Sequence, residues 1–307
     1  MLNIAAGTSS YPINNSLRLR SSASAYLSRT PASASGNGTF TCSFWVKRTN
    51  LGSLGRIVNA GSGTSDTFGF NSNDTFQFQF DTTGQNLITT QVFRDPSAWY
   101  HFVVVLDTSQ ATASNRAKIY VNGSQITAFS TATYPAQNAT GNINSNVIQN
   151  IGRRPATGTE YFDGYLAEMY MITGQALTPS SFGSTNSTTG VWQPAKYTGT
   201  YGTNGFYLKF SNIALTSGSN TGLGQDFSGN GNYWNTNNIS VTSGTTYDAM
   251  IDSPTNASAG TQPVGNYCVI NPLNAYSSIT IGSANLKATI TEAAYRKAVC
   301  TMAYPTS

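Results

Sequence analysis

Large apolar residues recur at every second position along several short segments of the chain. The segment TFTCSFWVKR, residues 39–48, alternates in this way from Phe40 to Val46, and TFQFQFD repeats the pattern with three phenylalanines. Successive side chains of a strand point to opposite faces, so a period of two indicates strands with one buried face. The apolar run WYHFVVVLD, residues 99–107, predicts a strand that is covered on both faces. These patterns predict an all-β fold.

The amino-acid composition favours the same fold class. Charged residues make up 9% of the 307 residues, against about 25% in ordinary soluble domains. Ser, Thr, Asn and 29 Gly take their place, and these residues favour turns and short strands over helices. The aromatic content of 12% supplies rings for a packed core and argues against disorder. The length corresponds to one large β domain or two smaller ones.

Two short motifs predict how the chain turns. Asn122-Gly123 lies between two alternating runs, and both residues accept a positive φ at low cost, so we expect a β-hairpin. Thr178 followed by Pro179 predicts one short helical turn, because Thr caps helices and Pro suits the first helical position. Near the end, the segment ITEAAYRKAV, residues 290–299, fits either a short helix or a strand.

The segment YFDGYLAEMYMIT, residues 161–173, carries large side chains at odd and even positions alike. Strict alternation divides them between two faces: Phe162, Leu166, Tyr170 and Ile172 on one, Tyr161, Tyr165, Met169 and Met171 on the other. We therefore expect a strand that lies between two layers of a sandwich.

The Asp163-Gly164 pair within this segment has two explanations. In the first, Gly164 permits a bulge or the close approach of a neighbouring backbone, and Asp163 accepts nearby hydrogen bonds. In the second, Asp163 contacts a metal ion or a sugar. We favour the first explanation.

The acidic residues of this region do not support catalysis. A glycosidase needs two carboxyl groups about 5 Å apart, or up to about 9.5 Å apart in inverting enzymes. Asp163 points to the opposite face of a strand from Glu160 and Glu168, and those two are separated by about 26 Å along it. His101 is the only histidine, and the chain has no Gly-x-Ser-x-Gly elbow, so we interpret it as structural. The protein is predicted not to be an enzyme.

Charge and hydropathy exclude two classes of partner. The net charge is +4, and no basic run is longer than Arg153-Arg154, so the clustered basic face of a nucleic-acid binder is missing. No stretch approaches 18 apolar residues, so we expect no insertion into a membrane. The first residues lack the basic start and apolar block of a secretory signal.

Three cysteines, Cys42, Cys268 and Cys300, lie far apart in the sequence. Their odd number and wide spacing argue against a disulfide framework and against a Cys-x-x-Cys metal site. We expect three buried thiols in a protein that is made in a reducing cytoplasm.

Aromatic residues in the expected loops are compatible with sugar recognition. Aromatic rings stack on pyranose faces, while amide, carboxylate and backbone groups bind the sugar hydroxyls. The candidate ligand-binding residues are Tyr134, Tyr161, Tyr197, Tyr201 and Trp234. The same rings can instead pack the loops onto the sandwich, and for each ring we favour packing.

The composition changes after about Ser187, where Gly, Asn and Pro become frequent and long apolar runs end. We divide the chain into an N-terminal arm (1–15), a jelly-roll sandwich (16–187), an extended strap with isolated strands (188–275) and the start of a second β module (276–307). One of the isolated strands is expected from Phe206 to Phe210.

Seven strings of residues, taken in order, form a recognisable series. They are SAYLSRTP, TFTCSFWVKR, DPSAWYHFVVVLDTSQATASNRAKIYVNGSQIT, YFDGYLAEMYMITGQALTPSSFG, KYTGTYGTNGFYLKF, DFSGNGNYWNTNNISVT and IDSPTN…GNYCVINPLN. The series resembles virion proteins of tailed phages, marine ones in particular, whose first half is a laminin-G-like or concanavalin-A-like jelly-roll module. In that family a sandwich of the SPRY type follows, so we expect the full protein to extend beyond residue 307.

The resemblance implies a virion structural protein that is assembled in the host cytoplasm. We expect a tail-fibre or adhesin component that docks on other virion proteins and presents lectin-like β domains to host surface polysaccharide. Fibres are commonly trimeric, so a homotrimer is expected. Laminin-G relatives often hold Ca²⁺ with loop aspartates, and Asp95 and Asp163 would be the first candidates; no other cofactor is implied. Two alternatives stay open, a capsid decoration or head-fibre protein and a soluble glycan-binding lectin.

Overall fold

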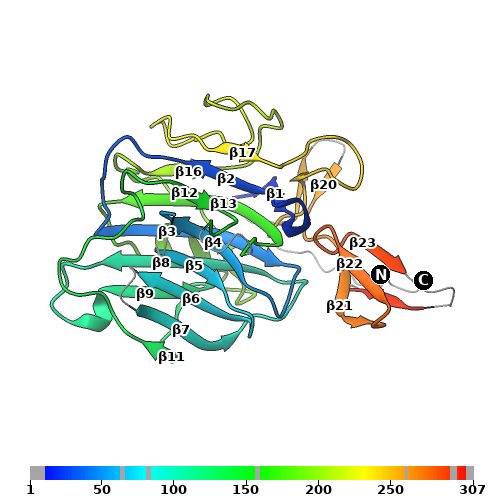
Figure 1. Cartoon of the computed structure of the whole chain (residues 1–307), viewed down its shortest axis with the longest axis horizontal. Helices are drawn as coiled ribbons and strands as arrows, with labels where there is room; N and C mark the ends of the chain where they lie inside the picture. Colours follow the sequence, from blue (N-terminus) through cyan, green and yellow to red (C-terminus); the bar gives the residue numbers. More distant parts are fainter. Residues whose placement is uncertain are drawn as a thin grey trace.

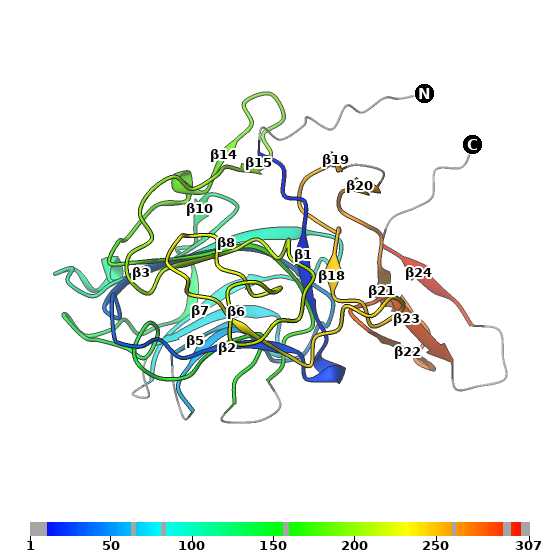
Figure 2. The same cartoon turned by 90° about the horizontal axis from the view of Figure 1, so that it is seen from above.

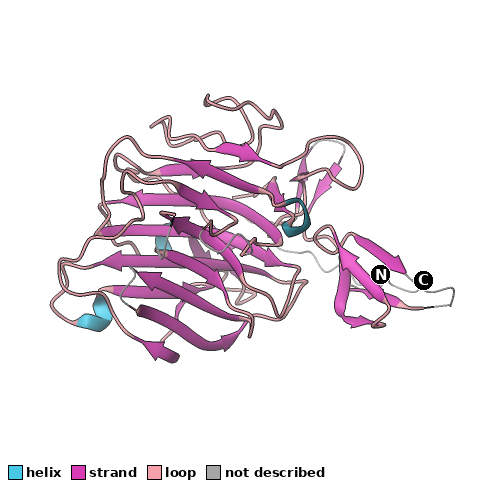
Figure 3. Cartoon of the chain, viewed as in Figure 1, coloured by secondary structure: helices cyan, strands magenta, loops and turns pink. Residues whose placement is uncertain are grey.

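The computed structural model describes residues 11–62, 66–80, 84–155, 160–259, 262–290 and 296–301. Regular structure in these ranges is β, apart from three short 3₁₀ helices (Figure 3). They are η1 (Ser21–Ala23), η2 (Ala113–Asn115) and η3 (Pro179–Ser181). No helix in the described ranges has the length and hydropathy that a membrane crossing requires.

Two antiparallel sheets of eight strands face each other (Figures 1 and 2). Across sheet A the order is β10 (Ser124–Gln125), β9 (Ala117–Val121), β8 (Trp99–Asp107), β3 (Thr39–Arg48), β13 (Gly164–Thr173), β1 (Ser16–Leu19) and β18 (Ala249–Met250), with β16 (Phe206–Leu208) paired to β13. Across sheet B the order is β11 (Phe129–Ala132), β7 (Gln85–Val92), β6 (Thr75–Phe80), β5 (Thr67–Phe70), β4 (Gly55–Ala60), β12 (Gln149–Ile151), β2 (Tyr26–Arg29) and β17 (Asn235–Asn237). The predicted all-β, jelly-roll sandwich is confirmed.

The remaining strands of the described chain form four two-stranded sheets. They are β14 (Gly183–Thr185) with β15 (Trp192–Pro194), β19 (Ala257–Ala259) with β20 (Gln262–Val264), β21 (Ile270–Ala275) with β24 (Ala298–Cys300), and β22 (Ile279–Gly282) with β23 (Lys287–Ile290). Strands β21 to β24 lie beyond one end of the sandwich, on the right in Figures 1 and 2.

The core between the two sheets is built mainly from phenylalanine. Phe40 and Phe44 of β3 are fully buried in it, as is Phe76 of β6, so the alternation predicted for these segments is confirmed. Strand β8 contributes Phe102 to this core, while Val103 packs in a second cluster on the outer face of sheet A. The expectation that residues 99–107 are covered on both faces is therefore also confirmed.

The predicted hairpin and the predicted helical turn are both present, but Thr178 makes no side-chain cap hydrogen bond; its hydroxyl pairs with that of Ser180 instead. Asn122 and Gly123 have φ values of 48° and 83° and connect β9 to β10, whose residues Val121 and Ser124 are paired. Pro179 occupies the start of η3, with Thr178 in an extended conformation before it. Residues 291–295 of the segment ITEAAYRKAV lie outside the described residues, and β23 and β24 flank them.

A β-bulge interrupts β13 and reverses the faces predicted for its second half. The pairing with β3 shifts register between Ala167 and Tyr170, and Glu168 has a φ of 47°. One extra residue in a strand moves all later side chains to the other face. Met169 and Met171 therefore enter the core, whereas Tyr170 lies outside with the second cluster. The predicted alternation was wrong beyond Ala167.

Gly164 has the structural role that we favoured. Its φ is 153°, and a Cβ at this position would overlap the carbonyl oxygen of Lys47 on the neighbouring strand. Asp163 accepts hydrogen bonds from the hydroxyl groups of Ser21 (2.7 Å) and Thr49 (3.2 Å). The pair thus lets two backbones approach each other and ties β13 to its neighbours.

Segment 188–275 adds edge strands to both sheets. Strand β16 pairs with β13, β17 pairs with β2, and β18 pairs with β1. Asp248, just before β18, forms buried ion pairs with Arg18 (3.1 Å) and Arg20 (2.7 Å). Strand β21 begins at Ile270, before the predicted boundary at 275/276. The domain bounds themselves stay predictions.

The cysteines differ in their exposure. Cys42 is buried in the core, but Cys268 and Cys300 are exposed. The prediction of three buried thiols was therefore wrong for the last two, because Cys268 lies just before β21 and Cys300 in β24, away from the core of the sandwich.

Candidate functional site

An open pocket of about 530 Å³ lies over the outer face of sheet A. Three of the four tryptophans line it: Trp45 of β3, Trp99 of β8 and Trp192 of β15. Trp45 points outward because its neighbours Phe44 and Val46 fill the core on the opposite face. Polar side chains of the lining come from Asn122, Ser124, Thr185 and Asn266.

The β14–β15 hairpin carries Trp192 onto the sheet. The Trp192 ring lies against the backbone at Gly123, where a Cβ would overlap it. Trp45 and His101 are cross-strand partners on β3 and β8. Their ring centroids are 4.9 Å apart, and the His101 ring stacks on Trp192 at 5.8 Å. The three rings thus form a continuous aromatic row.

His101 fixes the orientation of Trp192. The indole N–H of Trp192 donates to His101 Nδ1 over 3.0 Å, so the ring proton of a neutral His101 must be on Nε2. This Nε2 lies 2.8 Å from the Ser43 hydroxyl and donates to it. Burial lowers the pKa of His101 to about 3, so the imidazole stays neutral near pH 7. His101 is therefore a positioning residue for Trp192, in agreement with its predicted structural role.

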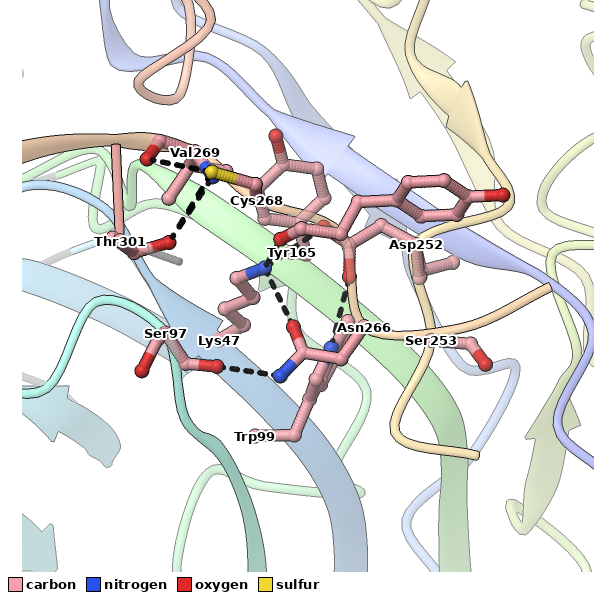
Figure 4. A network of polar contacts seen from close by, with 12 residues as sticks. Lys47, Ser97, Trp99, Tyr165, Asp252, Ser253, Asn266, Cys268, Val269 and Thr301 are labelled. Atoms are coloured by element: carbon pink, nitrogen blue, oxygen red, sulfur yellow. Dashed lines mark hydrogen bonds and ion pairs between the residues drawn. The ribbon is translucent and has the colours of Figure 1, made fainter. Parts of the chain in front are cut away.

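A buried ion pair supports the wall of the pocket at Trp99 (Figure 4). Asp252 accepts from the Trp99 indole N–H (3.0 Å) and from Lys47 Nζ (2.9 Å). Lys47 also donates to Asn266 Oδ1 (2.8 Å) and to the carbonyl oxygen of Tyr267 (2.7 Å), so all three ammonium protons have acceptors. Burial lowers the pKa of Lys47, and the Asp252 charge opposes this shift. The network joins Trp99 and Asn266, which are both lining residues.

The lining has the chemistry of a site for a neutral polar ligand. None of the lining residues that the structure describes is charged. Tryptophan rings offer flat apolar faces, and the Asn, Ser and Thr side chains offer hydrogen-bonding groups beside them. The side-chain oxygen Oδ1 of Asn122 accepts a hydrogen bond from the backbone N–H of His101 (2.8 Å), which leaves the side-chain amide nitrogen as the donor. A polyhydroxylated ring fits this combination.

Residues 21–183, more than half of the chain, match the family described as the concanavalin A-like lectin/glucanases superfamily. The chain belongs to this superfamily. The matched segment contains Trp45 and Trp99 of the lectin-like domain and ends just as β14 begins. Trp192 therefore comes from a hairpin that continues past the matched residues.

Three solved structures show distant similarity to the chain. A candidate carbohydrate-binding protein from Bacteroides ovatus has a TM-score of 0.47 and 16% identity, over 74% of this chain and 59% of that one, so less than two thirds of that protein is spanned. A heptameric SAP-like pentraxin from Limulus polyphemus has a TM-score of 0.40 and 16% identity, over 55% and 80% of the two chains. Trypanosoma rangeli sialidase has a TM-score of 0.34 and 15% identity, over 47% and 22%. No curated protein matches the sequence. Similarity this distant does not transfer function.

The aromatic residues predicted as sugar contacts do not line this pocket. Trp234 is 3% exposed and packs on Phe206, and Tyr197 is 6% exposed and stacks on Phe182. Both rings pack against the rest of the protein, as we favoured for each of the five rings, because residues 188–275 lie on the sandwich.

The other three predicted contacts are only partly buried. Tyr134 packs against the core, Tyr161 lies beside Tyr26, and Tyr201 stacks on Tyr207. Their part in ligand binding stays a prediction.

The two calcium candidates lie in different environments. Asp95 is exposed and accepts hydrogen bonds from the backbone N–H (2.8 Å) and hydroxyl (2.5 Å) of Ser97. Asp163 is inside the lectin-like domain, where burial raises its pKa. Within the described ranges no three His, Cys, Asp or Glu side chains form a group suited to a metal ion. Calcium binding stays an untested prediction.

The acids around β13 each have their own set of partners. Glu160 forms a buried ion pair with Arg56 (2.6 Å). Glu168, at the bulge, accepts hydrogen bonds from three phenols: Oε2 lies 2.7 Å from the Tyr170 hydroxyl and 3.0 Å from that of Tyr11, and the Tyr207 hydroxyl contacts Oε1 at 2.8 Å. Burial raises the pKa of Glu168, although these hydrogen bonds oppose the shift.

Glu168 is expected to make the domain less stable as the pH rises. An acid whose pKa is raised by folding contributes its full stability below the unfolded pKa, and this contribution is lost as the pH rises through the folded pKa. Glu168→Gln has no such titration. The unfolding free energy of the wild type, minus that of E168Q, should therefore fall from pH 4 to pH 8 in urea titrations.

Asp107→Asn is the matched control for this slope. Burial raises the pKa of Asp107, but hydrogen bonds from Ser109 and Gln110 outweigh it and lower the pKa overall. The corresponding difference for D107N should have the opposite sign of slope: it falls as the pH is lowered below the ordinary aspartate pKa of 3.8 and is nearly flat from pH 4 to pH 8. A flat difference for E168Q would show that Glu168 does not titrate differently in the folded state.

Proposed function

We propose that this chain is a non-catalytic sugar-binding module of a phage virion protein, in a tail fibre or adhesin. The observation that carries the proposal is the uncharged pocket in which three tryptophans meet Asn, Ser and Thr side chains. Membership of the concanavalin A-like superfamily is compatible with it. The ligand class is a neutral sugar of a surface polysaccharide, stacked on Trp192 and hydrogen-bonded by Asn122 and Asn266.

The virion context rests on the seven strings that resemble tailed-phage virion proteins. In such a particle the module would dock on other virion proteins, as a homotrimer, and present the pocket to the host surface. Only 9% of the residues are charged, so contacts made by this surface would depend little on salt, which screens exposed charges. Capsid decoration and a free lectin are the rival roles.

Trp192→Ala is expected to weaken binding of the isolated chain to host polysaccharide. Truncating a tryptophan at a binding hot spot costs about 2 kcal/mol or more, which is about 30-fold in Kd. The measurement is a titration of the chain with purified polysaccharide by calorimetry. Phe227→Ala, which removes a partly exposed ring outside the pocket, should bind as tightly as the wild type.

Two results would count against this pocket. Loss of binding in Tyr161→Ala but not in W192A would indicate that the sugar binds at the partly buried tyrosines instead of this pocket. Absence of binding to any host glycan would remove the sugar-binding part of the proposal. The number of copies per particle, from quantitative mass spectrometry or a density map, tests the rest: a few tens at most favour the tail, and hundreds favour the capsid.

A further inference from the structure

Cys268 and Cys300 come from neighbouring segments where β21 pairs with β24. Ile270 is opposite Cys300, and the Thr301 N–H donates to the carbonyl oxygen of Val269 over 2.7 Å. Cys268 is thus two residues before the partner of Cys300, in the segment that leads into β21, where the extended course of the chain would make it a diagonal neighbour of Cys300. The Thr301 hydroxyl also donates to Cys268 Sγ over 4.0 Å (Figure 4). A hydrogen bond with Cys268 raises the pKa of Cys300.

Reagents in solution can reach this pair but not the third cysteine. Cys268 and Cys300 are exposed, whereas Cys42 is buried in the core. Burial raises the pKa of Cys42, which keeps it protonated and unreactive. A disulfide needs Cα atoms within about 7 Å of each other. Diagonal neighbours on an antiparallel pair are about 7–8 Å apart, so closing the bond requires a small movement of the exposed segment around Cys268.

The strands that carry the pair have little core of their own. Leu273 is 64% exposed and Ile290 is 48% exposed, and all described side chains of β23 are exposed. Two-stranded sheets without a substantial apolar face are marginally stable. A disulfide between the first and the last of these strands would close a long loop. It would restrict the unfolded form of the unit and so stabilise the folded form. Cys268 also follows Asn266 and Tyr267, which bind Lys47 beneath the pocket.

We propose that Cys268 and Cys300 form a reversible disulfide that locks β24 onto β21. The oxidant is a small-molecule disulfide. The thiolate of one cysteine attacks it and releases one thiol, and the second cysteine then displaces the other half. The protein loses two protons and two electrons, and the oxidant leaves as two thiols. The pair is a dithiol in a reducing cytoplasm and a disulfide outside it. A virion protein would cross this boundary on release, a step that rests on the proposed function.

Incubating the reduced full chain with glutathione disulfide tests the proposal. We expect the number of cysteines that iodoacetamide alkylates in denaturant to fall from three to one, and the intact mass to fall by two hydrogens. Tryptic mapping should join the peptide containing Cys268 to the one containing Cys300. Cleavage of the native chain after Lys287 and Lys297 should slow by about tenfold or more, because the link restrains the opened form. Dithiothreitol should restore the original rate.

Cys300→Ser and Cys42→Ser are the matched variants. C300S should show no oxidant effect on digestion, whereas C42S should behave as the wild type. Retention of three alkylated cysteines, or one glutathione bound to each exposed cysteine, would overturn the disulfide. A disulfide that leaves the digestion rate unchanged would overturn the lock. Sugar binding is not measured, so either failure leaves the proposed function standing.

Discussion

Arg48→Ala is expected to destabilise the domain by about 3–5 kcal/mol, the cost typical of breaking a buried ion pair. Arg48 is 1% exposed and bonds Asp74 (3.0 Å) and the carbonyl oxygen of Phe93 (2.5 Å). Its guanidinium also lies 4.2 Å from the centre of the Phe70 ring. The substitution leaves a cavity and a buried carbonyl without this donor. Guanidinium chloride unfolding, followed by tryptophan fluorescence, measures the loss.

Arg94→Ala is the control, because Arg94 binds the same carboxylate from the surface. The Arg94 side chain is 56% exposed and lies 2.8 Å from Asp74. Exposed ion pairs contribute about 1 kcal/mol or less. The two variants therefore compare buried and exposed arginines on one acid. Equal losses of unfolding free energy in R48A and R94A would contradict the expectation that the buried ion pair contributes more to stability than the exposed one.

Phe102→Ala is expected to cost about 3–5 kcal/mol, as large-to-small substitutions of buried aromatic residues do. Phe102 is fully buried at the centre of the aromatic core. Its ring centroid lies near four phenylalanine rings: Phe76 (4.3 Å), Phe93 (5.1 Å), Phe44 (5.8 Å) and Phe70 (5.8 Å). Phe44 belongs to sheet A and Phe70 and Phe76 belong to sheet B, so removing the Phe102 ring weakens the interface that holds the two sheets together.

The same unfolding experiment distinguishes this core from the surface. Phe227 is 38% exposed, and F227A should cost about 1 kcal/mol or less, because surface substitutions rarely cost more. Phe102→Leu retains most of the apolar volume and should be intermediate. A loss of less than about 1 kcal/mol in F102A would show that the two sheets do not depend on this ring cluster.

The candidate pocket is lined by aromatic residues other than the predicted sugar contacts. Of the five rings in the expected loops, Trp234 and Tyr197 are buried and none lines the pocket. The three tryptophans that line it were not predicted: Trp45 and Trp99 lie in the predicted strands themselves, and Trp192 lies in the hairpin that follows. One signal was available: Trp45 lies on the same face of its strand as Lys47, opposite Phe44. A large ring on a polar face needs a partner outside the sheet.

The sequence by itself determined the fold class and the local turns of this protein. Alternating residues placed Phe40, Phe44 and Phe76 in the core, and Asn122-Gly123 made a hairpin. These features depend on residues that are neighbours in the chain, so the period of two and the φ preference of each residue are sufficient to predict them.

Only the tertiary structure decided the bulge at Glu168, the aromatic row and the approach of Cys268 to the strand of Cys300. Each needs residues that are distant in sequence: Glu168 is held by Tyr11 and Tyr207, and Trp192 reaches His101 from a separate hairpin. A one-residue bulge changes which side chains face the core without altering local composition, so no short-range pattern reveals it. Contacts between distant segments follow from how the sheets pack, and that packing gave the chain its candidate site.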